Sequence, residues 1–289
     1  MQVAEQTLHA NGLAHHVVTW TPESPKATLL LAHGFLDLAW SWKPVAERLA
    51  SEGYRCVAWD WRGHGETEHV GAGGYYHFPD YVLDLAELFP QLVDEGLAGG
   101  KTHLLGHSMG GTVSTMFAAL RGDALASLTL VEGIGPPPWP FERTAEKFEA
   151  WLDGMAKLRA KEERPMADLD AAVSRMRVQN PRLDDDFGRF LAEKSTRPTE
   201  GGLVWRFDRR HRTTSPMPFR TELFSEFLRR VPVPVLYVAG EKGFRLPDED
   251  ARLALVPTSV KTHEIAGAGH MLHREEPEAL CRAWLEFVG

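Results

Sequence analysis

The sequence predicts an α/β fold in which a mostly parallel central sheet is flanked by helices and carries an inserted α-helical cap. Short apolar segments alternate with helix-forming segments over residues 27–131, the pattern of parallel strands joined by right-handed crossovers. The alternation stops after Glu132 and resumes at about residue 234. The polar, helix-rich stretch between these points is therefore predicted to be an insertion between two strands of the sheet.

The strands are predicted from apolar runs and turn signals. Residues 3–8 and 15–20 flank Asn11-Gly12, a strong hairpin-turn signal. The continuous apolar run at residues 27–32 suits a strand that is buried on both faces. Further strands are predicted at residues 54–59, 101–105, 127–131, 234–239 and 261–265.

Helices are predicted between the strands, where apolar residues recur at helical spacing. In the first of them Trp42, Val45 and Leu49 share one stripe, and Gly53 follows its end. The second contains Pro90, which predicts a kink. The helices are predicted at residues 40–51, 78–97, 112–120, 247–256 and 277–287.

The cap is predicted to comprise residues 136–215, which leaves residues 1–135 and 216–289 as the core. A proline-rich stretch at its start stops regular structure. Apolar residues then recur at helical spacing over residues 148–158 and 187–191. Because the sheet pattern resumes afterwards, an insertion accounts for the sequence better than a separate domain on a linker.

Composition narrows the classes of partner. The chain has 289 residues, enough for a sizeable core, and a formal net charge of -8, which argues against nucleic acid as a partner. The first residues show no secretory signal, and no apolar run could cross a bilayer. We therefore expect a cytoplasmic protein whose partner is a small molecule rather than a membrane. Cys56 and Cys281 are predicted to be buried free thiols.

A nucleophile elbow is predicted at Gly106-His107-Ser108-Met109-Gly110. An apolar run precedes this Gly-x-Ser-x-Gly pattern and helix-compatible residues follow it, which is the context that the motif requires. A serine on so sharp a turn has a strained backbone, and small flanking residues relieve the crowding. Ser108 is therefore the predicted nucleophile, at a sheet edge where a helix dipole favours developing negative charge.

A serine hydroxyl needs a base, usually an imidazole within hydrogen-bond reach. Of the 13 histidines, His270 is the predicted base, because its glycine-rich loop follows the last strand and so shares a sheet edge with Ser108. His273 is predicted to begin the following helix. Loop-fixing hydrogen bonds are predicted for His33, His64 and His107. Surface positions are predicted for His9, His15, His16 and His69.

Four motifs, in this order along the chain, resemble the α/β-hydrolase superfamily. They are His33-Gly34-Phe35, Asp60-x-Arg62-Gly63-His64-Gly65, the elbow, and Gly269-His270. The resemblance covers the whole core and implies the α/β-hydrolase fold and a Ser-His-acid triad. A weaker resemblance links residues 202–210 to a cap-exit segment of serine hydrolase-like proteins.

The acid departs from the commonest pattern of that superfamily. Many members carry it after the strand that follows the cap, as Gly-x-x-Asp, but this chain has Gly240-Glu241-Lys242-Gly243 there. A subset carries the acid after the strand before the cap, where Glu132 stands, and a carboxylate there is costly to leave unpartnered. Glu132 is therefore the predicted acid, although it could instead cap a loop or pair with the cap. Asp248 and Asp250 are the alternatives, but they suit a helix start.

Acyl transfer also needs donors aimed at the oxyanion. Elbow geometry makes the backbone N–H of Met109 one donor. The resemblance implies the N–H of Phe35 as the second. Aromatic residues near these loops, Trp40, Trp139 and Phe141, are predicted to line an apolar substrate site, with core packing as the equal alternative.

These predictions lead to a serine hydrolase that cleaves carboxylic esters of small or medium molecules and needs no metal or organic cofactor. Serine at the elbow argues against epoxide hydrolase and haloalkane dehalogenase chemistry, for which related proteins use aspartate. The same triad would also suit a C–C bond hydrolase, a lactonase, a thioesterase or an acyltransferase. A non-catalytic receptor for a small molecule is the alternative from another class.

Overall fold

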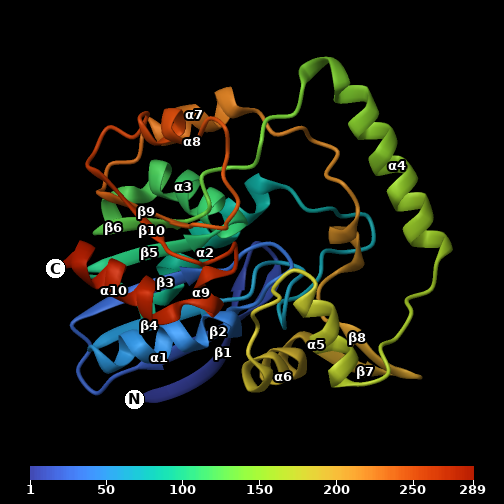
Figure 1. Cartoon of the computed structure of the whole chain (residues 1–289), viewed down its shortest axis with the longest axis horizontal. Helices are drawn as coiled ribbons and strands as arrows, with labels where there is room; N and C mark the ends of the chain where they lie inside the picture. The colour runs from blue at the N-terminus through green and yellow to red at the C-terminus, as the bar shows by residue number, and fades with distance from the viewer.

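An eight-stranded sheet forms the centre of the computed structural model, which describes residues 1–289 (Figure 1). Its strand order is β1-β2-β4-β3-β5-β6-β9-β10. β2 pairs antiparallel with β1 and β4, and the other neighbours are parallel. The predicted fold class is therefore confirmed. The strands are β1 (Gln2–Ala10), β2 (Leu13–Thr21), β3 (Ala27–Ala32), β4 (Tyr54–Trp59), β5 (Thr102–His107), β6 (Ser127–Val131), β9 (Val235–Gly240) and β10 (Val260–Ile265).

Helices cover both faces of the sheet (Figure 1). One face carries α1 (Lys43–Ser51), α9 (Leu272–Glu275) and α10 (Pro277–Val288), and the other carries α2 (Phe78–Asp94), α3 (Met109–Arg121) and α7 (Thr221–Leu228). α8 (Glu249–Leu253) lies against α7. Short 3-10 turns complete the core at η1 (Ala39–Trp42) and η2 (Gly122–Ala124).

The central strands are buried along their whole length because helices exclude water from both of their faces. Every residue of β3, β5, β6 and β9 is buried. Two large apolar clusters result, and they contain the fully buried Trp59 and Trp284, respectively. Burying one such indole removes about 200 Å² from water, worth on the order of 5 kcal/mol before the entropy cost. Both Cys56 and Cys281 are free and buried.

The predicted surface position is wrong for two of the four histidines. His15 and His16 lie in β2 and are buried, whereas His9 and His69 are exposed. His16 Nδ1 lies 2.7 Å from Asp60 Oδ2, so its ring joins a buried polar network. The strand prediction at residues 15–20 is correct, but the covering of β2 by its neighbours is a tertiary effect that no local pattern reports.

The chain leaves the sheet after β6 and returns at β9. Between them lie η3 (Phe141–Arg143), α4 (Thr144–Ala160), α5 (Leu169–Arg177), α6 (Asp185–Ser195), β7 (Thr196–Thr199), β8 (Gly202–Trp205) and η4 (Arg209–Arg212). β7 and β8 pair as an antiparallel hairpin, which the sequence had not indicated. α4 has no buried residue and lies at the edge of the molecule, where it contacts η4 (Figure 1). The boundaries of the cap at residues 136 and 215 stay a prediction.

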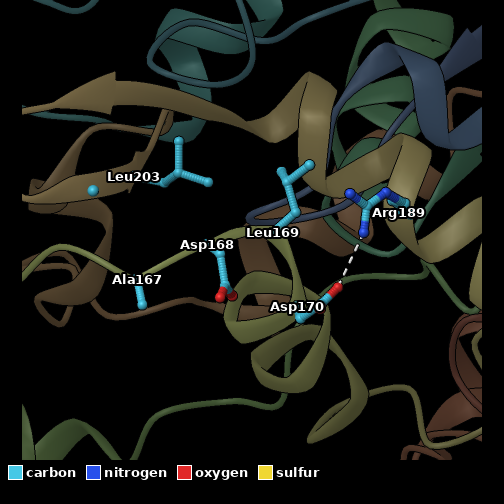
Figure 2. Close-up of a pocket in the computed structure, with 7 residues that line it drawn as sticks. Ala167, Asp168, Leu169, Asp170, Arg189 and Leu203 are labelled. Atoms are coloured by element: carbon cyan, nitrogen blue, oxygen red, sulfur yellow. Dashed lines mark hydrogen bonds and ion pairs between the residues drawn. The ribbon is translucent and has the colours of Figure 1, made fainter.

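A surface hollow of about 340 Å³ lies within this inserted segment (Figure 2). Its rim includes Asp168, which caps the first turn of α5, and Asp170, which pairs with Arg189 of α6. None of the predicted site residues lines this hollow. No helix of the protein combines the length and the apolar character that crossing a bilayer requires.

Candidate active site

Ser108 lies at the sharp turn between β5 and α3. Its backbone has φ of +51° and ψ of -117°, a conformation that an L-residue adopts only when its surroundings enforce it. The Ser108 N–H donates to the carbonyl of Val131 at 2.9 Å, and its own carbonyl accepts from the N–H of Thr112 at 3.1 Å. The turn is therefore fastened both to the neighbouring strand β6 and to its own helix.

The two glycines of the elbow are required by close backbone approach. A Cβ at Gly106 would lie 2.5 Å from the carbonyl oxygen of Gly110. A Cβ at Gly110 would lie 2.5 Å from the carbonyl oxygen of His33, at the end of β3. Because these neighbours are backbone atoms, no side-chain rotation could relieve the overlap.

His270 lies in the loop between β10 and α9, and its ring faces the nucleophile. Its Nε2 is 3.1 Å from Ser108 Oγ. The loop is held by two hydrogen bonds: His107 Nε2–H donates to the carbonyl of His270 at 2.8 Å, and the N–H of Gly269 donates to Glu275 Oε2 at 2.8 Å. The residue beside the nucleophile thus helps to position the imidazole.

Glu132 follows β6 directly and turns its side chain toward the same imidazole. Its Oε2 lies 2.6 Å from His270 Nδ1, and its side chain is fully buried. Oε1 accepts from the N–H of Gly240 at 2.8 Å, and Oε2 accepts from the N–H of Phe244 at 2.9 Å. These donors stabilise the charged carboxylate away from water.

The structure brings Ser108, His270 and Glu132 into one chain of contacts, and it keeps the two alternative acids apart from it. Asp248 Oδ2 accepts from Arg252 Nε at 2.9 Å, and Asp250 is exposed at the start of α8. A Cβ at Gly243 would overlap the Glu132 carboxylate. The glycine therefore leaves free the space into which Glu132 reaches.

The two predicted oxyanion donors belong to the two segments that adjoin the nucleophile. Met109 is the first residue of α3, and Phe35 lies in the turn after β3. That turn lies against the elbow, because a Cβ at Gly34 would be 3.3 Å from Ser108 Cβ. Neither amide donates in the turn and loop hydrogen bonds of the protein. Both N–H groups therefore remain available to a ligand.

The three aromatic residues predicted to line the substrate site lie in different surroundings. Trp40 packs on Trp20 and Phe190 within the core, and its Nε1–H donates to Glu5. The Trp139 Nε1–H donates to the carbonyl of Arg143, and Phe141 is 76% exposed. None of these contacts reaches the Ser108–His270 pair, so their role stays a prediction.

Sequence reasoning missed Phe244 and the partner of His64, both beside the site. The backbone of Phe244 holds Glu132, and its half-exposed ring lies edge-on to His270 with centroids 6.4 Å apart. His64 Nε2 accepts the N–H of Leu36, in the turn that carries Phe35, at 3.2 Å. The glycine at position 243 was the available signal for the first. For the second, the predicted loop-fixing role was correct, but the loop it fixes lies 28 residues away.

One buried group of side chains has metal-ligand character. Asp37, His107 and His273 bring ligand atoms within 4.8 Å of one another. Asp37 already pairs with Arg274 and with His273 Nε2, and His107 uses its Nε2 on the His270 carbonyl. Burial raises the pKa of Asp37, but Arg274 and His273 outweigh it and hold that pKa below its ordinary value. A cation would have to displace Arg274, so the cluster is better suited to an internal ion pair.

Comparison with known proteins adds independent evidence. Residues 29–283 match the model of the alpha/beta hydrolase family. The chain is 29% identical over 281 residues to a serine hydrolase-like protein of Danio rerio, covering 93% of this chain and 83% of that protein.

Two solved structures are similar over nearly the whole chain. The thioesterase domain from the curacin biosynthetic pathway superposes with a TM-score of 0.84 at 28% identity, covering 99% of this chain and 100% of that one. The hypothetical protein PA1622 from Pseudomonas aeruginosa PAO1 superposes with a TM-score of 0.85 at 30% identity, covering 98% and 99%.

Proposed function

The chain belongs to the α/β-hydrolase family and is a hydrolase, and from this premise we propose that it is a serine hydrolase that cleaves carboxylic esters of small or medium molecules. One observation carries the proposal: the continuous contacts from Ser108 Oγ through the His270 imidazole to the buried Glu132 carboxylate. This is the arrangement that turns an unreactive hydroxyl into a nucleophile.

In the first half of the proposed reaction, Ser108 Oγ attacks the ester carbonyl carbon while His270 Nε2 takes the hydroxyl proton. Glu132 accepts the Nδ1–H of His270 and so stabilises the imidazolium that forms. The tetrahedral oxyanion accepts hydrogen bonds from the N–H groups of Phe35 and Met109. When it collapses, the C–O bond breaks and His270 returns the proton to the leaving alcohol.

In the second half, water replaces the alcohol. His270 takes a proton from the water as its oxygen bonds to the acyl carbon, and the same two N–H groups stabilise the second oxyanion. Collapse releases the carboxylic acid and returns the proton to Ser108 Oγ. No step in this sequence calls for a cofactor.

Thioester hydrolysis is the second candidate. It is favoured by the similarity to a thioesterase domain at 28% identity over the full length of both chains. The acyl-enzyme would be the same, and only the leaving group differs, a thiol in place of an alcohol. Lactone or C–C bond cleavage and acyl transfer to another acceptor would use the same triad and stay as further alternatives.

Turnover of a short-chain p-nitrophenyl ester tests whether the protein is a serine hydrolase, and a fluorophosphonate probe labels the nucleophile. We expect hydrolysis, and labelling that the Ser108→Ala variant abolishes. Absence of both in the folded wild-type protein would favour a non-catalytic receptor. A panel of oxoesters, thioesters and lactones of matched acyl chain then separates the candidates by kcat/KM.

A further inference from the structure

The turn that carries the Phe35 amide contains a strained residue. Leu36 has φ of +57°, a conformation that side-chain-bearing residues seldom adopt. Its N–H donates to His64 Nε2 at 3.2 Å, and His64 comes from a separate loop after β4. The Leu36 N–H and the Phe35 carbonyl share one peptide plane, so this contact fixes the plane that directly follows the one containing the Phe35 N–H.

The partners of His64 determine its tautomer. Nδ1 lies 3.0 Å from the carbonyl of Arg62, which can only accept, so Nδ1 carries the proton. Nε2 faces the Leu36 N–H, which can only donate, so Nε2 presents its lone pair. Burial holds the pKa of His64 well below its ordinary value, and the ring stays neutral. A neutral His64 with this tautomer is what the turn requires.

The inserted segment covers the other side of His64. The ring of His211, from η4, lies on it with centroids 4.2 Å apart, and the Tyr76 ring lies 3.9 Å from His211. The Tyr76 hydroxyl donates to Asp208 Oδ2 at 2.7 Å, and the N–H of Asp208 donates to the carbonyl of Gly63 at 2.8 Å. The stretch 208–211 is therefore fastened to the loop that holds His64.

The Phe35 side chain meets both histidines. Its ring is edge-on to His64, with centroids 6.1 Å apart, and to His211, with centroids 5.5 Å apart. Burial lowers the pKa of His211 to about 4, so this ring is also neutral near pH 7. The turn is thus held through its backbone by His64 and through its exposed aromatic ring by His211.

We propose that His64 is a positioning residue for the oxyanion hole and that the inserted segment sets its place through His211. Neither side chain needs to touch the reacting atoms. His64 holds the Leu36 N–H and so anchors the turn one peptide plane after the Phe35 N–H, and His211 packs against both His64 and Phe35. This inference rests on the proposed serine hydrolase function and assigns to the segment a part in transition-state stabilisation.

The first test compares two substitutions that differ in the contact at issue. His64→Phe keeps a ring for stacking but removes the acceptor, and His64→Gln keeps an acceptor that can reach Leu36. Losing one oxyanion donor costs about 10²- to 10³-fold in kcat, so we expect His64→Phe to lose about 10- to 100-fold. KM should change by less than about threefold, and His64→Gln should recover most of the rate.

A transition-state analogue separates positioning from general damage. A boronic acid forms a tetrahedral adduct with the serine, and its affinity should fall in parallel with kcat/KM in His64→Phe. His103→Phe is the matched control, because His103 is also a buried neutral histidine but lies at the end of β5 that is far from Ser108. We expect it to lower the unfolding temperature but to leave kcat and boronate affinity unchanged.

A double-mutant cycle tests the role of His211. His211→Ala should lower kcat, and combining it with His64→Phe should cost clearly less than the product of the two single losses. Multiplicative losses, or equal effects of His64→Phe and His64→Gln, would overturn the inference. If His64→Phe does not fold, an unchanged kcat in folded His211→Ala would overturn it as well. Inactive wild-type protein would instead refute the proposed function.

Discussion

The Glu132 carboxylate fills the space that a side chain at Gly243 would occupy. Gly243 lies after β9 and Glu132 lies after β6, and these strands are neighbours in the sheet. The two positions therefore offer alternative routes for a carboxylate to reach His270 Nδ1. This chain uses the longer side chain of Glu132, from the strand next to the one that leads into the elbow, and Gly243 leaves room for it.

An exchange of the two positions tests this relationship. We expect Gly243→Asp alone to lose most of its activity, because its side chain collides with Glu132 and adds a second negative charge in a buried space. Glu132→Ala/Gly243→Asp should be more active than Glu132→Ala, since the aspartate would occupy the vacated space. Measuring kcat for the same ester tests both comparisons.

Glu132→Ala/Gly243→Ala is the control for this exchange. It places a Cβ at position 243, as the aspartate variant does, but supplies no carboxylate. Equal rates in the two double variants would contradict the predicted exchange.

The assignment of the acid gives a second prediction. Glu132→Gln should lower kcat by about 10³- to 10⁴-fold, because loss of the orienting carboxylate leaves the imidazole without its partner. Asp248→Asn should retain kcat within about threefold, since Asp248 pairs with Arg252 rather than with His270. Steady-state kinetics on the same ester distinguishes them, and the reverse ranking would refute Glu132.

Gly110→Ala tests the packing beneath the elbow. The added Cβ would meet the carbonyl oxygens of Ala32 and His33, so the end of β3 would have to shift. We expect a loss of about 1–3 kcal/mol in the free energy of unfolding, together with reduced kcat, because the same shift moves the Phe35 turn.

Gly73→Ala is the matched control for the elbow glycine, since its Cβ would meet no atom within 4 Å. Denaturant unfolding should show it within about 0.5 kcal/mol of wild type. A similar loss in both variants would mean that glycine replacement in general, rather than contact with β3, is responsible.

The buried His103 predicts a dependence of stability on pH. Burial lowers the pKa of His103 to about 4, against 6.5 for an ordinary histidine. Between these values the unfolded chain binds a proton at His103 that the folded protein does not, so the free energy of unfolding falls as the pH falls. The contribution of His103 to the slope of the free energy of unfolding against pH approaches about 1.4 kcal/mol per pH unit, the value for a difference of one bound proton.

His103→Gln should therefore flatten the stability–pH curve between pH 6.5 and 4 by up to about this slope. Denaturant unfolding of both proteins at several pH values measures the difference. Curves that run parallel below pH 6.5 would show that folding does not perturb this imidazole.

Backbone strain is concentrated at the candidate site. Apart from Asn11 in the hairpin turn, the residues other than glycine with positive φ are Leu36, Ser108 and Glu132. Of these three residues, only Ser108 has a sequence pattern around it that predicts strain, the Gly-x-Ser-x-Gly motif of a sharp turn. At Leu36 and Glu132 no local pattern exists, because the strain is imposed by contacts with distant loops.

The amino-acid sequence by itself determined the α/β fold, the strands and most core helices, and the elbow at Ser108, because these depend on periodicity and turn chemistry within short segments. The loop after the last strand placed His270 at the correct edge for a similar reason. The tertiary structure decided how such segments meet. It brings Glu132 to His270 through the space left by Gly243, and it buries His15 and His16. It also places His64 and His211 against the Phe35 turn. Each depends on the distance between atoms far apart in the chain, which only the packed fold defines.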